Sequence, residues 1–151
     1  MAMAEVFKNF NANLTQVDSD LEIVPSGLLE NTSNNSINSR TVGSVIQVHS
    51  LYVTNVWTPR IINENRYKEE YFKHFDLFII DKNDNSKIYI AHDVELVPGC
   101  PFYIEKNITL TPSQTLNIYA PTSGDSTQGN SSVNIHVVAS AIEFLSDEAS
   151  E

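Results

Sequence analysis

The sequence is short of the residues that cross-linking and nucleotide chemistry require. It has one cysteine, Cys100, and five glycines in 151 residues. A single cysteine cannot form a disulfide within the chain, which is typical of folding in a reducing compartment. No glycine lies in a phosphate-binding array, so a nucleotide site has no support. The sequence also lacks a basic segment followed by an apolar run at its start, and we expect no secretory signal.

Basic side chains are scarce as well. Nine lysines and arginines stand against 19 aspartates and glutamates, which gives a net charge of −10. Such a charge repels nucleic acids and anionic membranes, because binding to either depends largely on lysine and arginine. No apolar run approaches the roughly 20 residues that a membrane-spanning helix needs. The composition predicts neither a nucleic-acid nor a membrane partner and leaves protein surfaces as candidates.

Residues that could act in catalysis are scattered. The four histidines lie in separate segments, without the spacing of a metal site. No serine lies in a Gly-x-Ser-x-Gly motif, and Cys100 follows a Pro-Gly turn without a neighbouring base. These patterns predict a protein that is not an enzyme and has no catalytic residues, cofactor or metal.

One segment resembles the start of a calcium loop. Residues 81–85 read Asp-Lys-Asn-Asp-Asn, which places oxygen ligands at alternating positions. However, Ser86 replaces the glycine of such a loop, and His92 stands where a bidentate glutamate is needed. Strand-like residues flank the segment on both sides, so a hairpin turn is the better interpretation.

Strand signals dominate the rest of the chain. Residues 42–56 are rich in β-branched and aromatic residues and predict a long strand, with a bulge near His49 and Ser50. Residues 71–91 predict a hairpin. Further strands are predicted at 21–24, 102–104, 108–110, 116–119 and 133–145. About eight strands with frequent turns predict an all-β fold, an antiparallel β-sandwich or jelly roll with an extended N-terminal arm.

The predicted organisation has three parts: an N-terminal arm at 1–18, a β-sandwich domain at 19–145 and an acidic tail at 146–151. The first twenty residues are polar and asparagine-rich, with a few apolar residues spaced through them. They fit either a short amphipathic helix on the body or an arm that orders on a neighbouring chain. The arm interpretation makes four of them candidate partner-binding residues: Val6, Phe7, Phe10 and Leu14.

Residues 57–70 interrupt the strand pattern, and part of this segment could be helical because Tyr67, Tyr71 and Phe75 are four residues apart. The segment has the tryptophan, tyrosine and arginine content of interface hot spots. The same residues could instead cap one end of the sandwich. The interface interpretation adds four candidate partner-binding residues: Trp57, Arg60, Arg66 and Tyr67.

The order of the strand and turn signatures is itself informative. The signatures are Phe7-Lys8-Asn9-Phe10, Ile23-Val24-Pro25-Ser26-Gly27, Val45-Ile46-Gln47-Val48, Leu51-Tyr52-Val53-Thr54-Asn55, Tyr89-Ile90-Ala91-His92-Asp93-Val94, Val97-Pro98-Gly99, Ile108-Thr109-Leu110-Thr111-Pro112, Leu116-Asn117-Ile118 and Ser140-Ala141-Ile142-Glu143. Over nearly the whole chain this order resembles the small β-sandwich virion structural proteins of tailed bacteriophages, especially of marine and cyanobacterial phages. The sequence departs from them at residues 57–70, in the acidic tail and at Pro112-Ser113, where a glycine is usual.

The resemblance implies a non-catalytic structural protein of the virion, assembled in the host cytoplasm. It implies docking in multiple copies on capsid, neck or tail subunits, as a decoration, neck or tail component, and a homo-oligomer. The alternative is a trimeric receptor- or glycan-binding head, with Trp57 and Tyr67 as sugar contacts. A third hypothesis, a hydrolase of cell-surface polymer, lacks an identifiable pair of carboxylates.

Overall fold

The computed structural model describes residues 3–28, 39–56, 73–122 and 132–146. These ranges contain nine β-strands and no helix, so none of the described residues forms a helix that could cross a membrane. The strands are β1 (Met3–Gln16), β2 (Leu21–Val24), β3 (Val45–Asn55), β4 (Lys73–Asp81), β5 (Lys87–Leu96), β6 (Phe102–Ile104), β7 (Ile108–Leu110), β8 (Gln114–Tyr119) and β9 (Ser132–Ser146).

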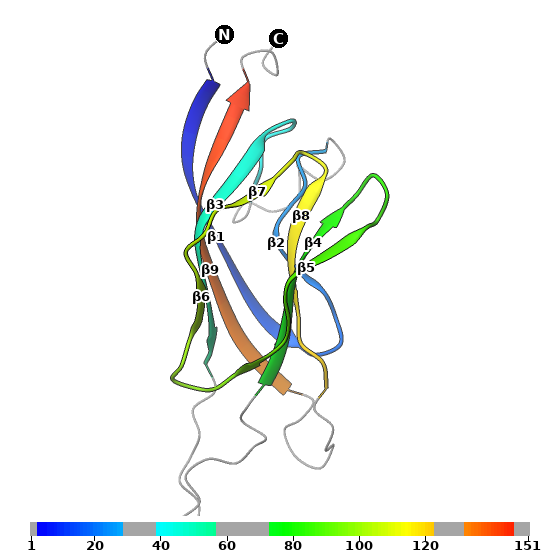
Figure 1. Ribbon diagram of the computed structural model, residues 1–151, viewed down its shortest axis with the longest axis vertical. Helices are drawn as coiled ribbons and strands as arrows, with labels where there is room; N and C mark the ends of the chain where they lie inside the picture. Colours follow the sequence, from blue (N-terminus) through cyan, green and yellow to red (C-terminus); the bar gives the residue numbers. More distant parts are fainter. Residues whose placement is uncertain (1–2, 29–38, 57–72, 123–131, 147–151) are drawn as a thin grey trace, which may run out of the picture.

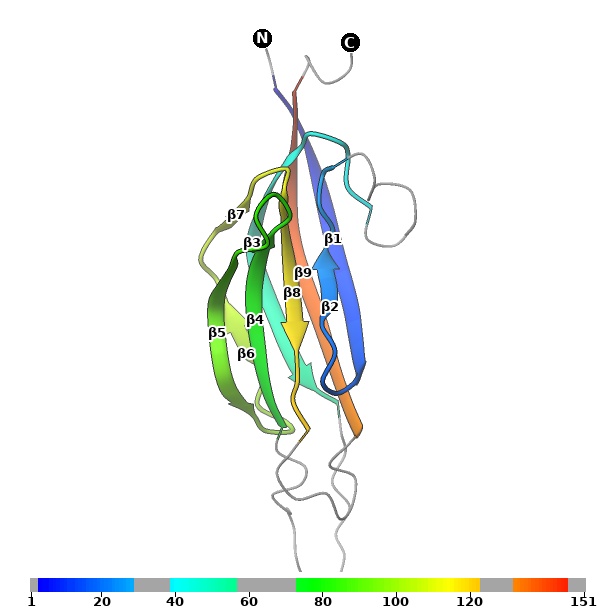
Figure 2. The same ribbon diagram turned by 90° about the vertical axis from the view of Figure 1, so that its right-hand side faces the viewer.

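The strands form two antiparallel sheets that pack face to face (Figures 1 and 2). Sheet A has the order β1-β9-β3-β6, and β7 also pairs with β3. Sheet B has the order β2-β8-β4-β5. The predicted all-β sandwich is therefore confirmed.

The connectivity is that of a jelly roll. Strands β6 and β7 pair with successive parts of β3, so together they fill one strand position. The chain then forms one long antiparallel hairpin in which β1 pairs with β9, β2 with β8, β3 with β6 and β7, and β4 with β5. Pairing of β9 with β3 and of β8 with β4 rolls this hairpin into two sheets. Eight positions wound in this way define the jelly roll.

Alternation along the strands builds the core between the sheets. In β9 every second residue from Val133 to Ala141 is buried, because successive side chains of a strand point to opposite faces. In β3 the buried residues change phase between Val48 and Leu51, and the register shifts between Val48 and Ser50. The bulge predicted at this point is confirmed.

Residues 3–16, expected to form a helix or an arm, are instead strand β1 at the edge of sheet A. The strand pairs with β9 along its length, from Met3 opposite Ser146 to Gln16 opposite Ser132. Phe10 is 0% exposed and belongs to the hydrophobic core. The physical reason is the run Asn9-Phe10-Asn11-Ala12-Asn13-Leu14, whose alternation directs apolar side chains inward and asparagines outward. Burial of Phe10 and Leu14 stabilises the strand in its own sandwich.

The segment between β4 and β5 is a hairpin turn, as predicted. The Asp81 N–H donates to the Ser86 carbonyl at 3.0 Å, and the Asn85 N–H donates to the Asp81 carbonyl at 2.7 Å. The carboxylates of Asp81 and Asp84 accept hydrogen bonds from N–H groups two residues further on. Asn85 has a φ of 59°, a conformation that asparagine tolerates better than most residues. The turn's carboxylates thus stabilise its own backbone.

Candidate functional site

The predicted partner-binding residues fall at different places. Phe7, on β1, is 82% exposed and Val6 is 37% exposed, whereas Phe10 and Leu14 face the core. The other four, Trp57, Arg60, Arg66 and Tyr67, lie outside the described residues. The end of β3 and the start of β4, which flank that segment, lie at the opposite end of the sandwich from the start of β1 (Figure 1). The structure does not bring these strand ends together with Phe7.

The outer face of sheet A carries almost no charge. Its outward-facing residues form rows across the strands, since residues opposite each other in a ladder lie side by side on one face. The rows are Thr54, His136 and Asn13; Tyr103, Tyr52, Val138 and Asn11; Ser50, Ser140 and Asn9; Thr109, Gln47, Ile142 and Phe7; and Val45, Phe144 and Glu5. They include no lysine or arginine, and Glu5, in the last row, is their one carboxylate.

Exposed aromatic and aliphatic side chains extend from the β6 edge to the middle of this face. Tyr52 is 43% exposed, Tyr103 58% and Val138 45%. The two tyrosine rings stack across β3 and β6 with centroids 6.0 Å apart and planes at 29°. Few charges together with exposed tyrosine and phenylalanine are the composition found in the centre of protein interfaces.

The outer face of sheet B also exposes a tyrosine, Tyr89, but differs in carrying several charges. It carries Glu22, Asp76, Lys87 and Glu95 within or beside its ladder. The Lys87 ammonium lies over the Phe78 ring, 4.2 Å from its centroid, in a cation–π contact. The two faces of one sandwich therefore differ sharply in charge.

Two histidine–aspartate pairs lie on sheet B and are linked by a hydrogen bond from the Asp93 N–H to the Asp76 carboxylate. The His92 Nδ1 lies 3.0 Å from an Asp76 carboxylate oxygen, and the His74 Nδ1 lies 2.8 Å from an Asp93 oxygen. Within the described ranges, no group of three or more histidine, cysteine, aspartate or glutamate side chains could hold a metal ion. Among the described side chains, these two histidine–aspartate pairs come nearest to a catalytic arrangement, and in each pair the histidine and the carboxylate are hydrogen-bonding partners.

The pKa values of the Glu22 and Asp18 carboxyl groups are shifted in opposite directions. Partial burial raises the pKa of the Glu22 carboxyl, and Lys82, 3.8 Å away, opposes this shift. Hydrogen bonds lower the pKa of Asp18: the Thr122 hydroxyl has the largest effect, the Thr122 N–H follows, and the Tyr119 hydroxyl adds to them. Asp18 lies in the turn after β1 and links it to the segment that follows β8.

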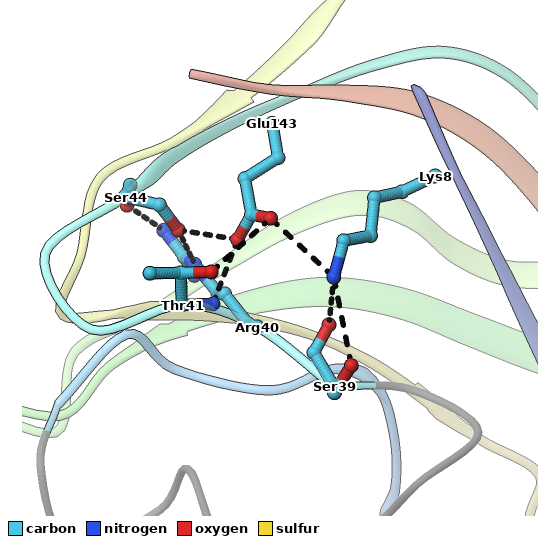
Figure 3. A network of polar contacts seen from close by, with 6 residues as sticks. All are labelled: Lys8, Ser39, Arg40, Thr41, Ser44 and Glu143. Carbon is cyan, nitrogen blue, oxygen red and sulfur yellow. Dashed lines mark hydrogen bonds and ion pairs between the residues drawn. The ribbon is translucent and has the colours of Figure 1, made fainter. Parts of the chain in front are cut away.

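A buried carboxylate lies on the inner side of sheet A. Glu143 points inward from β9 and its side chain is 1% exposed. It accepts hydrogen bonds from the Thr41 N–H at 2.7 Å and the Ser44 hydroxyl at 2.8 Å (Figure 3). The Lys8 ammonium, from β1, lies 3.4 Å from its other oxygen and also donates to the Ser39 carbonyl. Glu143 thus connects β9 and the edge strand β1 to the segment before β3.

Arg40 completes this network. It is 2% exposed, and its Nε donates to the same Ser44 hydroxyl at 3.3 Å. Burial lowers the pKa of its guanidinium to about 10, and the Glu143 carboxylate opposes this shift, so the group remains cationic at neutral pH. Its terminal nitrogens donate to five carbonyl oxygens, those of Pro25, Ser44, Leu110, Thr111 and Gln114. The network holds the two sheets together where β1 begins and β9 ends.

The residues at the centre of the uncharged face were not among those the sequence predicted. Tyr52 lies between the buried residues Leu51 and Val53, and Val138 lies between buried neighbours in β9. A run of apolar residues in a strand indicates that both of its faces are apolar, and this signal is visible in the sequence. Recognising that the runs form one row with Tyr103 requires the strand register.

No protein-family model matches the sequence, and no curated protein matches it. Among solved structures, a chain from Bacillus endospore appendages, described as disulfide-linked pili, is similar over 97% of this chain and 93% of that chain, with 9% identity and a TM-score of 0.48. VP2 of the infectious bursal disease virus subviral particle is similar over 93% of this chain but 32% of that chain, with 9% identity and a TM-score of 0.48. A xylan-binding domain from Paenibacillus barcinonensis has 8% identity, coverage of 93% and 85%, and a TM-score of 0.35. This chain therefore spans about a third of the VP2 chain, and similarities of this size leave function to be inferred from the surface itself.

Proposed function

We propose that the chain is a non-catalytic structural protein of a bacteriophage virion, which docks in multiple copies as a capsid decoration, neck or tail component. The observation that carries this proposal is the outer face of sheet A. An acidic protein gains solubility from charged surfaces, yet this face has one carboxylate and exposes tyrosine, phenylalanine and valine. Such a surface is suited to burial against other protein chains.

The roles of the buried charges support a structural function. Arg40 and Glu143 are directed at backbone groups and short hydroxyl side chains, which hold loops and sheets together. Groups that act on a substrate need a reacting atom within reach in a shared cavity. In this network the polar atoms are occupied by the protein's own main chain, so its effect is to make the sandwich rigid.

On β1 the proposal assigns docking to Phe7 in the outer face and to Val6, which is partly exposed on the other side of the strand, opposite Glu143. Phe10 and Leu14 stabilise the same strand from the inside, so the strand presents Phe7 as a fixed part of a surface. Trp57, Arg60, Arg66 and Tyr67 remain a predicted second contact region. The partners are other virion proteins and further copies of the chain, assembled in the host cytoplasm.

The test is the content of purified particles. Quantitative mass spectrometry of washed virions should detect many copies of this chain in each particle. A Phe7→Lys variant, supplied in place of the native chain, should be incorporated about tenfold less, because a charge would be buried at the docking surface. Ile88→Lys is the control, since Ile88 is an exposed side chain of β5, 58% exposed. Absence of the native chain from washed particles, or equal incorporation of both variants, would contradict the proposal.

The stacked tyrosines favour one alternative, a glycan-binding head. Tyr52 and Tyr103 present two exposed rings on the outer face of sheet A, and aromatic rings of this kind can pack on the apolar face of a sugar. A glycan array and competition of phage adsorption by the purified protein test this alternative. Specific binding that is lost in Tyr103→Ala would support it, and a negative result in both assays removes it.

A further inference from the structure

We infer that the outer face of sheet A is the interface between two copies of this chain, which pack face to face about a two-fold axis. The inference rests on the proposed function and deepens it, because it names the partner of this surface. It is carried by the distribution of charge over the two faces and by the row of side chains across sheet A.

Charge determines where two copies can meet. Each copy carries a net charge of −10, so approach through most of the surface is opposed by repulsion between carboxylates. The outer face of sheet B contains three carboxylates, Glu22, Asp76 and Glu95, against one lysine of its ladder, Lys87, so two copies meeting through it would bring an excess of negative charge together. The outer face of sheet A keeps its one carboxylate, Glu5, in an end row, and self-association through it buries no cluster of like charge.

Charge also discriminates against a different partner. A basic protein would gain several ion pairs on sheet B but could use only Glu5, in the end row, on sheet A. A partner for sheet A must itself be nearly neutral and rich in side chains that pack or share hydrogen bonds. A second copy of the same face has this composition by necessity.

The row at the centre of the face is suited to an isologous contact. Tyr103, Tyr52, Val138 and Asn11 cross all the strand positions of sheet A in one line. In a two-fold interface each residue of such a row meets the row of the other copy running the opposite way. Sheets that pack face to face lie about 10 Å apart, which is filled by side chains the size of tyrosine and valine. The neighbouring row of Ser50, Ser140 and Asn9 can share hydrogen bonds with the other copy.

The experiment measures self-association of the full chain by sedimentation velocity over a concentration series. The wild-type chain should form dimers. Val138→Glu should weaken dimerisation at least about 30-fold, the effect of losing a hot-spot contact and placing carboxylates opposite each other. Ile88→Glu makes the same change of charge at an exposed aliphatic residue of sheet B and should leave dimerisation unchanged. Circular dichroism checks that each variant is folded, and Tyr103→Glu, at the edge of the face, replaces Val138→Glu if that variant unfolds.

The outcomes separate this inference from the proposed function. A wild-type chain that stays monomeric at every concentration, or dimers that persist in both face variants, overturns the inference, even if the chain is found on particles. Dimers that are lost only in the face variants support it. If such dimers form while the chain is absent from washed virions, the interface stands and the virion proposal fails.

Discussion

Arg40 is the side chain on which one end of the sandwich depends. It connects the end of β2, the start of β3 and the segment between β7 and β8 through its carbonyl partners. We expect Arg40→Met to lower the free energy of unfolding by about 3–5 kcal/mol, since the change leaves several buried carbonyl acceptors without their donor and removes a buried positive charge near the Glu143 carboxylate. Urea unfolding measures the loss.

Two variants test the origin of this stability. Lys8→Met removes the more exposed cation near Glu143 and should cost less than ~1 kcal/mol. Arg40→Met combined with Glu143→Gln should cost less than the two single changes added together, because the two residues belong to one network. A loss below ~1 kcal/mol for Arg40→Met would show that the network contributes little.

Two carboxyl groups should give opposite dependence of stability on pH. The raised pKa of Glu22 means that the folded state binds its proton more tightly than the unfolded state, so its contribution to stability falls as pH rises through the window above 4.5. The lowered pKa of Asp18 means that its contribution is present above 3.8 and is lost as pH falls below that value.

We therefore expect Glu22→Gln to raise the free energy of unfolding slightly at neutral pH and Asp18→Asn to lower it. Both differences should shrink in acid, that of Glu22→Gln as pH approaches 4.5 and that of Asp18→Asn below 3.8. Urea unfolding at a series of pH values provides the measurement. If both substitutions changed the free energy of unfolding in the same direction at neutral pH, the opposite pKa shifts of Glu22 and Asp18 would be contradicted.

At the scale of one element, β1 combines an inner and an outer role. Phe10→Ala should lower the free energy of unfolding by about 3–5 kcal/mol, since it removes a fully buried ring from the core. Phe7→Ala, three residues away on the outer side, should change it by less than ~0.5 kcal/mol. Thermal or urea unfolding of the two variants makes the comparison. Similar small effects for both would mean that β1 is dispensable to the fold.

The strands show how far local sequence determines this fold. The long strand with its bulge, the hairpin of β4 and β5 and the last strand follow from patterns of neighbouring residues within each segment. Strand β1 follows from an equally local alternation at Asn9-Phe10-Asn11, but the wider spacing of its apolar residues also fits a helix or an arm. Its partner β9 lies at the other end of the sequence, and this long-range pairing decides between them.

The candidate site was harder to predict for the same reason. Phe7 was identified because it is an apolar residue in a polar segment. Tyr52, Tyr103 and Val138 lie in different strands, and no pattern of neighbouring residues in the sequence indicates that they form one row. The absence of charge from a whole face becomes visible only when the register places the rows next to each other.

For the whole molecule, net charge should govern how association responds to salt. If two chains of charge −10 meet through a nearly neutral face, salt screens their repulsion and favours dimers. We expect the dimer dissociation constant to fall by about threefold or more between 0.1 M and 1 M NaCl, because the screening length shortens from about 10 Å to about 3 Å. Sedimentation velocity at both salt concentrations measures it. Weaker association in high salt would indicate contacts between opposite charges instead.

The position of β9 between β1 and β3 also determines when the molecule can form. The two strands that flank it are synthesised early and reach each other only through it, so sheet A lacks its middle until the last strand has left the ribosome. Until then Phe10 has no core to enter. Because ladders between such distant segments close slowly, we expect the pairing of β9 with β1 and β3 to limit the rate at which this jelly roll folds.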